Sequence, residues 1–288
     1  MNSSRTKGIL CVISAAFFFS LMTLFLKLAG DLPAFEKSFF RNFVAIFFAA
    51  ATIIRYRIPL TVGNPSNLKY LIARSAGGTI GIFCNFYAVD HLVLSDANML
   101  NKLSPFFAVI FSFFLLKERI RPVQLFCLTL AFCGALLIIK PGISSLATFP
   151  ALLGAIGGMG AGFAYTFVRI ASQHGVKGPI IVLFFSVFSC LASIPLMLPV
   201  FVMPSVKQLV FLFLTGFAAA GGQFSITAAY SFAPAREISV YDYSQIIFAA
   251  LLGFLFFGEI PDLLSVAGYF TIAAASLIMF EVNKKDFS

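Results

Sequence analysis

The sequence has 288 residues, of which 60% are hydrophobic and only 11% are charged, whereas soluble domains carry about 25% charged residues. This composition excludes a water-soluble protein. The formal net charge is +9. The basic residues stand singly at the ends of apolar segments, a pattern that argues against a nucleic-acid-binding surface and favours a signal for orientation in a membrane.

Apolar runs long enough to cross a membrane recur along the whole chain. A helix needs about 20 residues to span a hydrocarbon layer about 30 Å thick. Prolines, glycines and charged residues mark the ends of the runs. We predict ten helices, at about residues 8–29, 34–54, 68–89, 94–116, 122–140, 149–171, 179–201, 207–230, 237–257 and 263–281. The expected fold class is an all-α integral membrane protein with ten transmembrane helices.

The positions of lysine and arginine predict how these helices are oriented. With a cytoplasmic N-terminus, the inner segments hold thirteen basic residues and the outer segments hold four. An even number of spans returns the chain to the side on which it began. We therefore expect both termini in the cytoplasm. The remaining three basic residues fall within predicted spans; they are Arg41, Arg74 and Lys102.

The second half of the sequence repeats the first half. At an offset of 141 positions, "LLKERI" aligns with "FFGEIP", which pairs Glu118 with Glu259; at an offset of 142, Lys27 aligns with Arg169. Each repeat holds five spans, an odd number, so the second copy enters the membrane from the opposite side. Inverted repeats of this kind support alternating access in secondary transporters. The predicted repeats are residues 1–145 and 146–288.

Both repeats place a glutamate at the end of their fourth helix, in "FFLLKERI" and "FLFFGEIP". With two five-helix repeats, these motifs resemble the EamA family of the drug/metabolite transporter superfamily over nearly the entire chain. The resemblance implies a carrier in the cell membrane, the inner membrane of a bacterium. It implies a central cavity lined by the first four helices of each repeat, no cofactor, and a monomer or homodimer. From their positions, we expect Glu118 and Glu259 to be architectural.

Four residues of the predicted fourth helix share one face, because Asn98, Asn101, Lys102 and Pro105 fall at positions i, i+3, i+4 and i+7. A charged residue within hydrocarbon costs about 3 kcal/mol or more and therefore faces a partner or a hydrated cavity. Pro105 also frees the carbonyl of Asn101 from its helical hydrogen bond. We expect this face to line a cavity.

The predicted second helix carries a similar polar stripe of Ser38, Arg41 and Asn42, with Glu36 nearer the outer mouth. The two stripes lie at comparable depth, so we expect them to meet across one cavity. Arg41 and Lys102 would then bind a carboxylate or phosphate group, and neighbouring amides would add hydrogen bonds. Glu36 is a candidate for ion coupling.

The predicted ninth helix carries Asp242 and Gln245 on one face, and Asp242 aligns with Asn101 of the first repeat. Asp242 is the best acidic candidate for a proton or cation site. The alternative is a structural ion pair with Arg74 or Arg236. Gln245 stands beside the position equivalent to the proline of the first repeat and adds a hydrogen-bonding amide.

Arg74 lies about six residues from the cytoplasmic end of the predicted third helix. Its guanidinium group could reach the interface from there, or it could face the cavity, and the sequence leaves both open. Small residues downstream predict close packing against a neighbouring helix. Those of the third helix are Gly77, Gly78 and Gly81, and those of the sixth helix are Gly154, Gly158 and Gly162.

Tyr87, Tyr165 and Tyr241 are candidates for the aromatic walls of a ligand site. The five cysteines and the two histidines show no metal-ligand spacing, so we expect no metal site. The sequence has eleven acidic residues, and no two of them stand at i, i+3 or i, i+4 within a predicted span. An integral membrane enzyme that modifies lipids would need such clustered carboxylates, so this function is disfavoured.

The favoured function is a secondary carrier of a small polar metabolite, such as an amino acid or related organic anion. An exporter of aromatic or cationic drug-like compounds is the alternative. A channel or receptor would need no repeat. The sequence contains no ATP-binding motif, so a proton gradient, substrate exchange or simple facilitation would drive transport.

Overall fold

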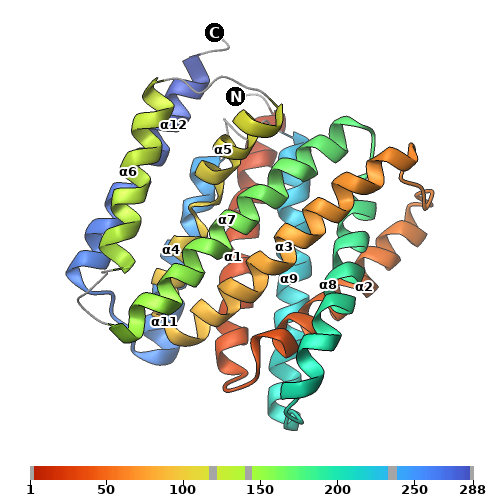
Figure 1. The fold of residues 1–288 in the computed structure, drawn as a ribbon, viewed down its shortest axis with the longest axis horizontal. Coiled ribbons are helices and arrows are strands. Elements are labelled where there is room, and N and C mark those ends of the chain that lie inside the picture. Colours follow the sequence, from red (N-terminus) through yellow and green to blue (C-terminus); the bar gives the residue numbers. More distant parts are fainter. Residues whose placement is uncertain (1–2, 117–121, 140–144, 233–238, 286–288) are drawn as a thin grey trace.

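The computed structural model describes the chain except residues 1–2, 117–121, 140–144, 233–238 and 286–288 (Figure 1). The described residues form helices and no strands. The helices of the first repeat are α1 (Ser3–Leu28), α2 (Ala34–Arg55), α3 (Leu68–His91), α4 (Leu94–Asn101), α5 (Ser104–Leu116) and α6 (Pro122–Ile139). Those of the second are α7 (Ser145–Gln173), α8 (Gly178–Met197), α9 (Val206–Phe232), α11 (Ser244–Phe257) and α12 (Leu263–Lys285). Short 3₁₀ helices are η1 (Pro65–Asn67), η2 (Leu198–Val200) and η3 (Ser239–Tyr243).

Six stretches of the described chain are long and apolar enough to cross a membrane, and three shorter apolar helices accompany them. Two spans are each divided between two helices, α4 with α5 and η3 with α11. Counted in this way, each repeat has five spans. The prediction of a ten-helix, all-α membrane fold built from two inverted repeats is confirmed.

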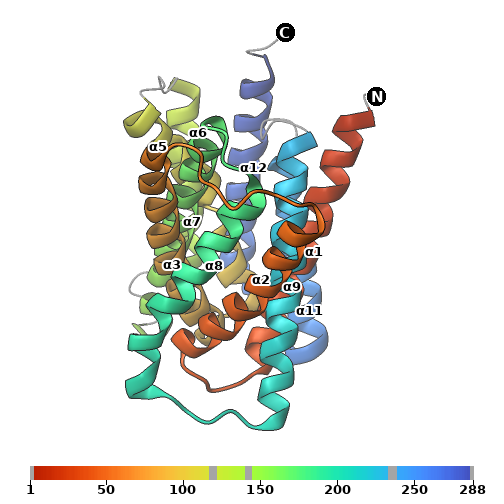
Figure 2. The same cartoon turned by 90° about the vertical axis from the view of Figure 1, so that its right-hand side faces the viewer.

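The packing of the helices follows an approximate two-fold symmetry between the repeats. Helix α1 packs against α9, and the equivalent of α1 in the second repeat, α7, packs against α3. Helices at equivalent positions also pack on each other, α2 with α8 and α6 with α12. The pair α6 and α12 stands at one side of the bundle (Figure 1), and α1 begins at the same end of the bundle at which α12 ends (Figure 2).

Glycines allow α3 and α7 to approach closely, as the small residues of both helices predict. A Cβ on Gly160 would lie 2.8 Å from the carbonyl oxygen of Gly77 and 2.8 Å from the Cα of Gly81. A Cβ on Gly158 would lie 2.6 Å from the carbonyl oxygen of Leu100, where α7 passes α4. Helix α7 therefore holds both α3 and the end of α4 by backbone contact.

The fourth span is broken, which differs from the continuous helix that the sequence predicts. Helix α4 ends at Asn101, and Lys102 and Leu103 form a turn before α5 begins at Ser104. Pro105 explains this break, because a proline has no N–H to donate to the carbonyl of Asn101 four residues earlier. The ninth span changes from 3₁₀ to α-helix after Tyr243, the residue equivalent to Lys102 at an offset of 141. No proline accounts for this second change.

Candidate functional site

A cavity of about 110 Å³ lies between the two repeats and receives side chains from both. Its walls come from α1, α2, α3, α4 and α5 of the first repeat and from α7, α8, α9, η3 and α11 of the second. The peripheral helices α6 and α12 contribute none of the lining residues. Seven of the predicted site residues line this cavity: Arg41, Asn98, Asn101, Lys102, Tyr165, Asp242 and Gln245.

The other predicted residues of α2 lie away from the cavity. Asn42 donates from Nδ2 to Ser38 Oγ and, at 2.9 Å, to Ser189 Oγ of α8, so these side chains join α2 to α8. Glu36 is fully buried, and its Oε2 accepts a hydrogen bond from the N–H of Val202 at 3.3 Å. The polar stripe of α2 is therefore divided between helix packing and the cavity.

Two of the three predicted tyrosines also lie outside the cavity. The ring of Tyr87 stacks on His91 with 4.1 Å between centroids and meets Phe149 edge to face. Tyr241 is not among the described residues that line the cavity. Only Tyr165 faces the cavity, where it lies within electrostatic range of Asp242 and of the arginines of α2 and α3.

Lys102 and Asp242 form an ion pair across the cavity, with 2.5 Å between Nζ and Oδ2. The pair joins the breaks of the fourth and ninth spans, and Tyr243 Oη donates to the carbonyl of Lys102 at 3.2 Å. The alternative of a structural ion pair of Asp242 is therefore observed, but its partner is Lys102 and not Arg74, because the turn after α4 brings Lys102 close to Asp242. Arg236 lies outside the described residues. Lys102 is consequently neutralised by the protein itself.

Asn98 and Gln245 bind each other from the two repeats, through a hydrogen bond from Gln245 Nε2 to Asn98 Oδ1. Asn98 Nδ2 donates to the carbonyl of Leu94 and to Thr23 Oγ1. Ser20 of α1 donates to the carbonyl of Gln245 at 3.0 Å. Gln245 of α11 thus contacts α4 through its side-chain amide and α1 through its main-chain carbonyl.

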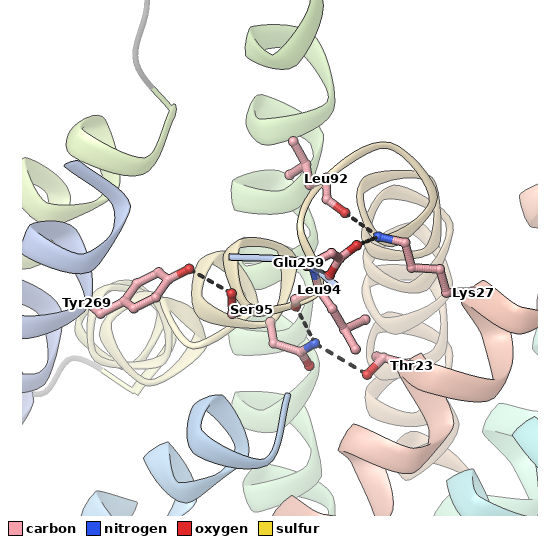
Figure 3. A network of polar contacts seen from close by, with 8 residues as sticks. Thr23, Lys27, Leu92, Leu94, Ser95, Glu259 and Tyr269 are labelled. Atoms are coloured by element: carbon pink, nitrogen blue, oxygen red, sulfur yellow. Dashed lines mark hydrogen bonds and ion pairs between the residues drawn. The ribbon is translucent and has the colours of Figure 1, made fainter. Parts of the chain in front are cut away.

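A second cross-repeat network lies near the start of α4 (Figure 3). Lys27 pairs with Glu259 and donates at 2.7 Å to the carbonyl of Leu92, while Glu259 Oε2 accepts the N–H of Leu94 at 2.9 Å. Tyr269 of α12 donates to Ser95 Oγ at 2.9 Å. The position of Glu259 agrees with an architectural role, and Glu118 lies outside the described residues.

Arg74 is buried, with 3% of its surface exposed, so the interpretation that its side chain extends to the interface is wrong. Its guanidinium carbon lies 3.5 Å from the ring centroid of Phe185, and that of Arg41 lies 5.8 Å from the same centroid. Arg41 Nη1 donates to Asn42 Oδ1 at 2.8 Å. Among the described residues, neither arginine has a carboxylate within ion-pair distance, and Arg74 Nε, Arg74 Nη1 and Arg41 Nε have no acceptor.

Sequence reasoning missed the role of Phe185 and left that of Arg74 open. One signal was available, because Gly78 lies one helical turn after Arg74. A Cβ on Gly78 would come within 2.9 Å of Arg74 Nη1 and 3.1 Å of the Phe185 ring. The glycine therefore makes room for the guanidinium group and for the aromatic ring on which it rests.

Ten spans in two inverted repeats around a charged cavity define a multi-pass membrane transporter. The chain belongs to the EamA-like transporter family, whose model matches residues 6–140 and 152–281. The family and its named relatives are transporters, and this chain is a transporter of small molecules in the lipid bilayer and not an enzyme.

Similar proteins cover almost the whole chain. The pseudopaline exporter CntI of Pseudomonas aeruginosa is 32% identical over 96% of this chain and 97% of its own length. The S-adenosylmethionine uptake transporter of Rickettsia prowazekii is 23% identical over 91% of this chain and 87% of its own length. A crystal structure at 15% identity, with a TM-score of 0.71, covers 98% of this chain and 99% of the solved one and supports the fold.

Proposed function

We propose that the protein is a secondary active carrier of a small polar metabolite that bears a negative charge, such as an amino acid or related organic anion. The observation that carries this proposal is the cavity between the repeats, where Arg41 and Arg74 are buried without a carboxylate partner among the described residues. Buried charges are normally paired. A substrate anion is the partner that this cavity lacks.

Transport in this proposal uses alternating access of two units, residues 1–145 and 146–288. A cavity of about 110 Å³ is smaller than the roughly 300–1,000 Å³ of ordinary ligand pockets. Substrate entry therefore requires the two units to separate. The ion pair of Lys102 and Asp242 joins breaks in two spans, and discontinuous helices of this kind commonly form the substrate site of secondary transporters.

Asp242 is the proposed site for ion coupling, in preference to Glu36, because only Asp242 lines the cavity. A proton on Asp242 would remove the charge that binds Lys102 and would release the two broken spans from each other. Substrate exchange is the other coupling that fits a symmetric carrier. Each protomer contains a complete cavity, so one chain suffices for transport whether the protein is a monomer or a homodimer.

For direction and orientation we propose export across the inner membrane, with both termini in the cytoplasm. The relative that is 32% identical over nearly its whole length is an exporter, and thirteen of the seventeen basic residues outside the spans fall on the proposed inner side. A carrier of this symmetry runs down whichever gradient is imposed. Cationic drugs are disfavoured as substrates, because two unpaired arginines repel a cation.

The test is counterflow in proteoliposomes with radiolabelled amino acids and organic anions. Arg41→Ala should abolish saturable exchange, because it removes a charge from the cavity. Arg55→Ala is the matched control, since Arg55 lies on the same helix and is exposed. Saturable exchange of cations alone, or equal exchange by both variants, would contradict the proposal.

A further inference from the structure

We infer that Arg74 and Arg41, supported by Phe185, form a binding site for a doubly charged anionic group, either two carboxylates or a phosphate monoester. This inference rests on the proposed function and deepens it by giving the charge of the substrate. In this site Lys102 does not bind the negative charge of the substrate, because Asp242 already neutralises it. Phe185 is a positioning residue in this site, because it contacts the two guanidinium groups.

The charge of the cavity sets the charge of the ligand. Among the residues that the structure describes, the charged side chains that line it are Arg41, Arg74, Lys102 and Asp242. Lys102 and Asp242 cancel each other at 2.5 Å, and the two arginines leave an uncompensated charge of +2. A charge buried in a low-dielectric interior is stable only when it is paired. A dicarboxylate, or a phosphate monoester with about −1.5 to −2 charges at pH 7, restores neutrality, whereas a zwitterion leaves the charge at +2.

The hydrogen-bonding groups favour an oxyanion over a simple halide. Arg74 Nε and Nη1 and Arg41 Nε are buried N–H groups without acceptors, and planar guanidinium groups match carboxylate and phosphate oxygens bidentately. The ring of Phe185 lies 3.5 Å from the guanidinium carbon of Arg74 and 5.8 Å from that of Arg41. The closer of these two cation–π contacts restrains the guanidinium group of Arg74 before a ligand arrives.

Gly78 indicates that the position of Arg74 is built into the fold. A Cβ there would collide with Arg74 Nη1 and with the Phe185 ring. Glu36, the acidic residue of α2, is buried but does not line the cavity, and its Oε2 accepts a backbone N–H. Lys37 pairs with Asp90 at 2.5 Å, outside the cavity lining. These groups therefore leave the charge count of the cavity unchanged.

The experiment measures binding, independently of transport, by the thermal shift of the purified full-length protein in detergent at constant ionic strength. The probes are succinate, glycerol phosphate, lactate, alanine and putrescine. Wild-type protein should be stabilised by succinate or glycerol phosphate at concentrations at which lactate, alanine and putrescine have no effect. The dianion that raises the melting temperature at the lower concentration identifies the bound group as carboxylate or phosphate.

Arg74→Gln separates a binding role from a structural one. It should weaken the affinity for the dianion by about tenfold or more and move the preference to the monoanion lactate. It should also raise the melting temperature of the ligand-free protein by about 2 °C or more, because an unpaired buried charge disappears. Arg74→Lys should keep the dianion preference at lower affinity, and Arg55→Gln should behave like wild type.

Three binding results overturn the inference. They are an unchanged dianion preference in Arg74→Gln, stabilisation of wild-type protein by alanine or putrescine at lower concentrations than by either dianion, and no response to either dianion. Each leaves the proposed carrier function open, because counterflow of a monoanion or an amino acid is measured separately. Loss of folding in Arg74→Gln, seen as a lower melting temperature, assigns Arg74 a structural role and also overturns the inference.

Discussion

The ion pair of Lys102 and Asp242 gives the sharpest stability prediction, because it joins the two repeats inside the cavity by opposite charges. The distance between Nζ and Oδ2 is 2.5 Å, which corresponds to a Coulomb attraction of about 7 kcal/mol at an effective dielectric constant of about 20. Desolvation of the two groups offsets most of this gain. Breaking the pair is costly for a different reason, since one buried charge then stays without a partner.

Lys102→Met should lower the free energy of unfolding by about 3 kcal/mol, the lower end of the range for a buried pair. We choose the lower end because the Asp242 side chain is 18% exposed. An unfolding entropy of about 2.1 cal/mol/K per residue over 288 residues gives about 0.6 kcal/mol/K. The melting temperature should therefore fall by about 5 °C.

The assay is a double-mutant cycle by thermal and denaturant unfolding in one detergent. Asp242→Leu should cost about as much as Lys102→Met, and the double variant should recover most of the loss because no unpaired charge of the pair remains. If the two single losses add in the double variant, with a coupling energy below about 0.5 kcal/mol, the pair does not join the repeats energetically and the reasoning is refuted.

Three further changes follow from the same geometry. Glu259→Gln should lower the melting temperature by several degrees, because it removes the partner of Lys27; Asp31→Asn, at an exposed loop residue, should have no effect. Gly160→Ala should destabilise the protein by about 1–3 kcal/mol in denaturant unfolding, because the new Cβ meets backbone at 2.8 Å; a change below about 0.5 kcal/mol would mean that α3 and α7 yield freely. Gly78→Ala should weaken dianion binding in the thermal-shift assay by moving the nearby arginine, and unchanged binding would show that its position is not critical.

The sequence predicts the fold well because the hydrocarbon layer of the membrane strongly constrains the length and polarity of each spanning helix. The ten spans and the repeat followed from apolar runs and from the alignment of Glu118 with Glu259. The break after Asn101 was not predicted. Pro105 frees one carbonyl in any helix, but whether the helix bends or unwinds depends on neighbours such as Gly158, whose missing side chain lets α4 end against α7.

The candidate site was predictable in part. A buried cation must face a partner or a cavity, and this rule placed Arg41 and Lys102 on the cavity that they line. The partner of Lys102 could not be derived, because Asp242 lies 140 positions away and reaches it only when the repeats pack. Asn42 shares the polar stripe of α2 yet binds Ser189, since a stripe fixes the face of a helix and not which neighbour covers each residue.

The charge count of the cavity connects substrate charge to the mode of transport. An empty cavity of charge +2 is costly to close, since each buried unpaired charge costs about 3 kcal/mol or more, whereas a cavity that holds a dianion is neutral. The loaded carrier should therefore change orientation faster than the empty one, and exchange should exceed net flux by about tenfold or more. Parallel measurements of counterflow and net uptake in proteoliposomes test this.

The variant Arg74→Gln supplies the matched comparison for the exchange prediction. It lowers the charge of the empty cavity, so the return of the empty carrier should become faster and the ratio of exchange to net flux should fall toward one. Equal rates of exchange and net uptake in wild-type protein would show that the empty cavity closes without hindrance. The charges of the two arginines would then already be solvated by water or paired with an ion before the substrate binds.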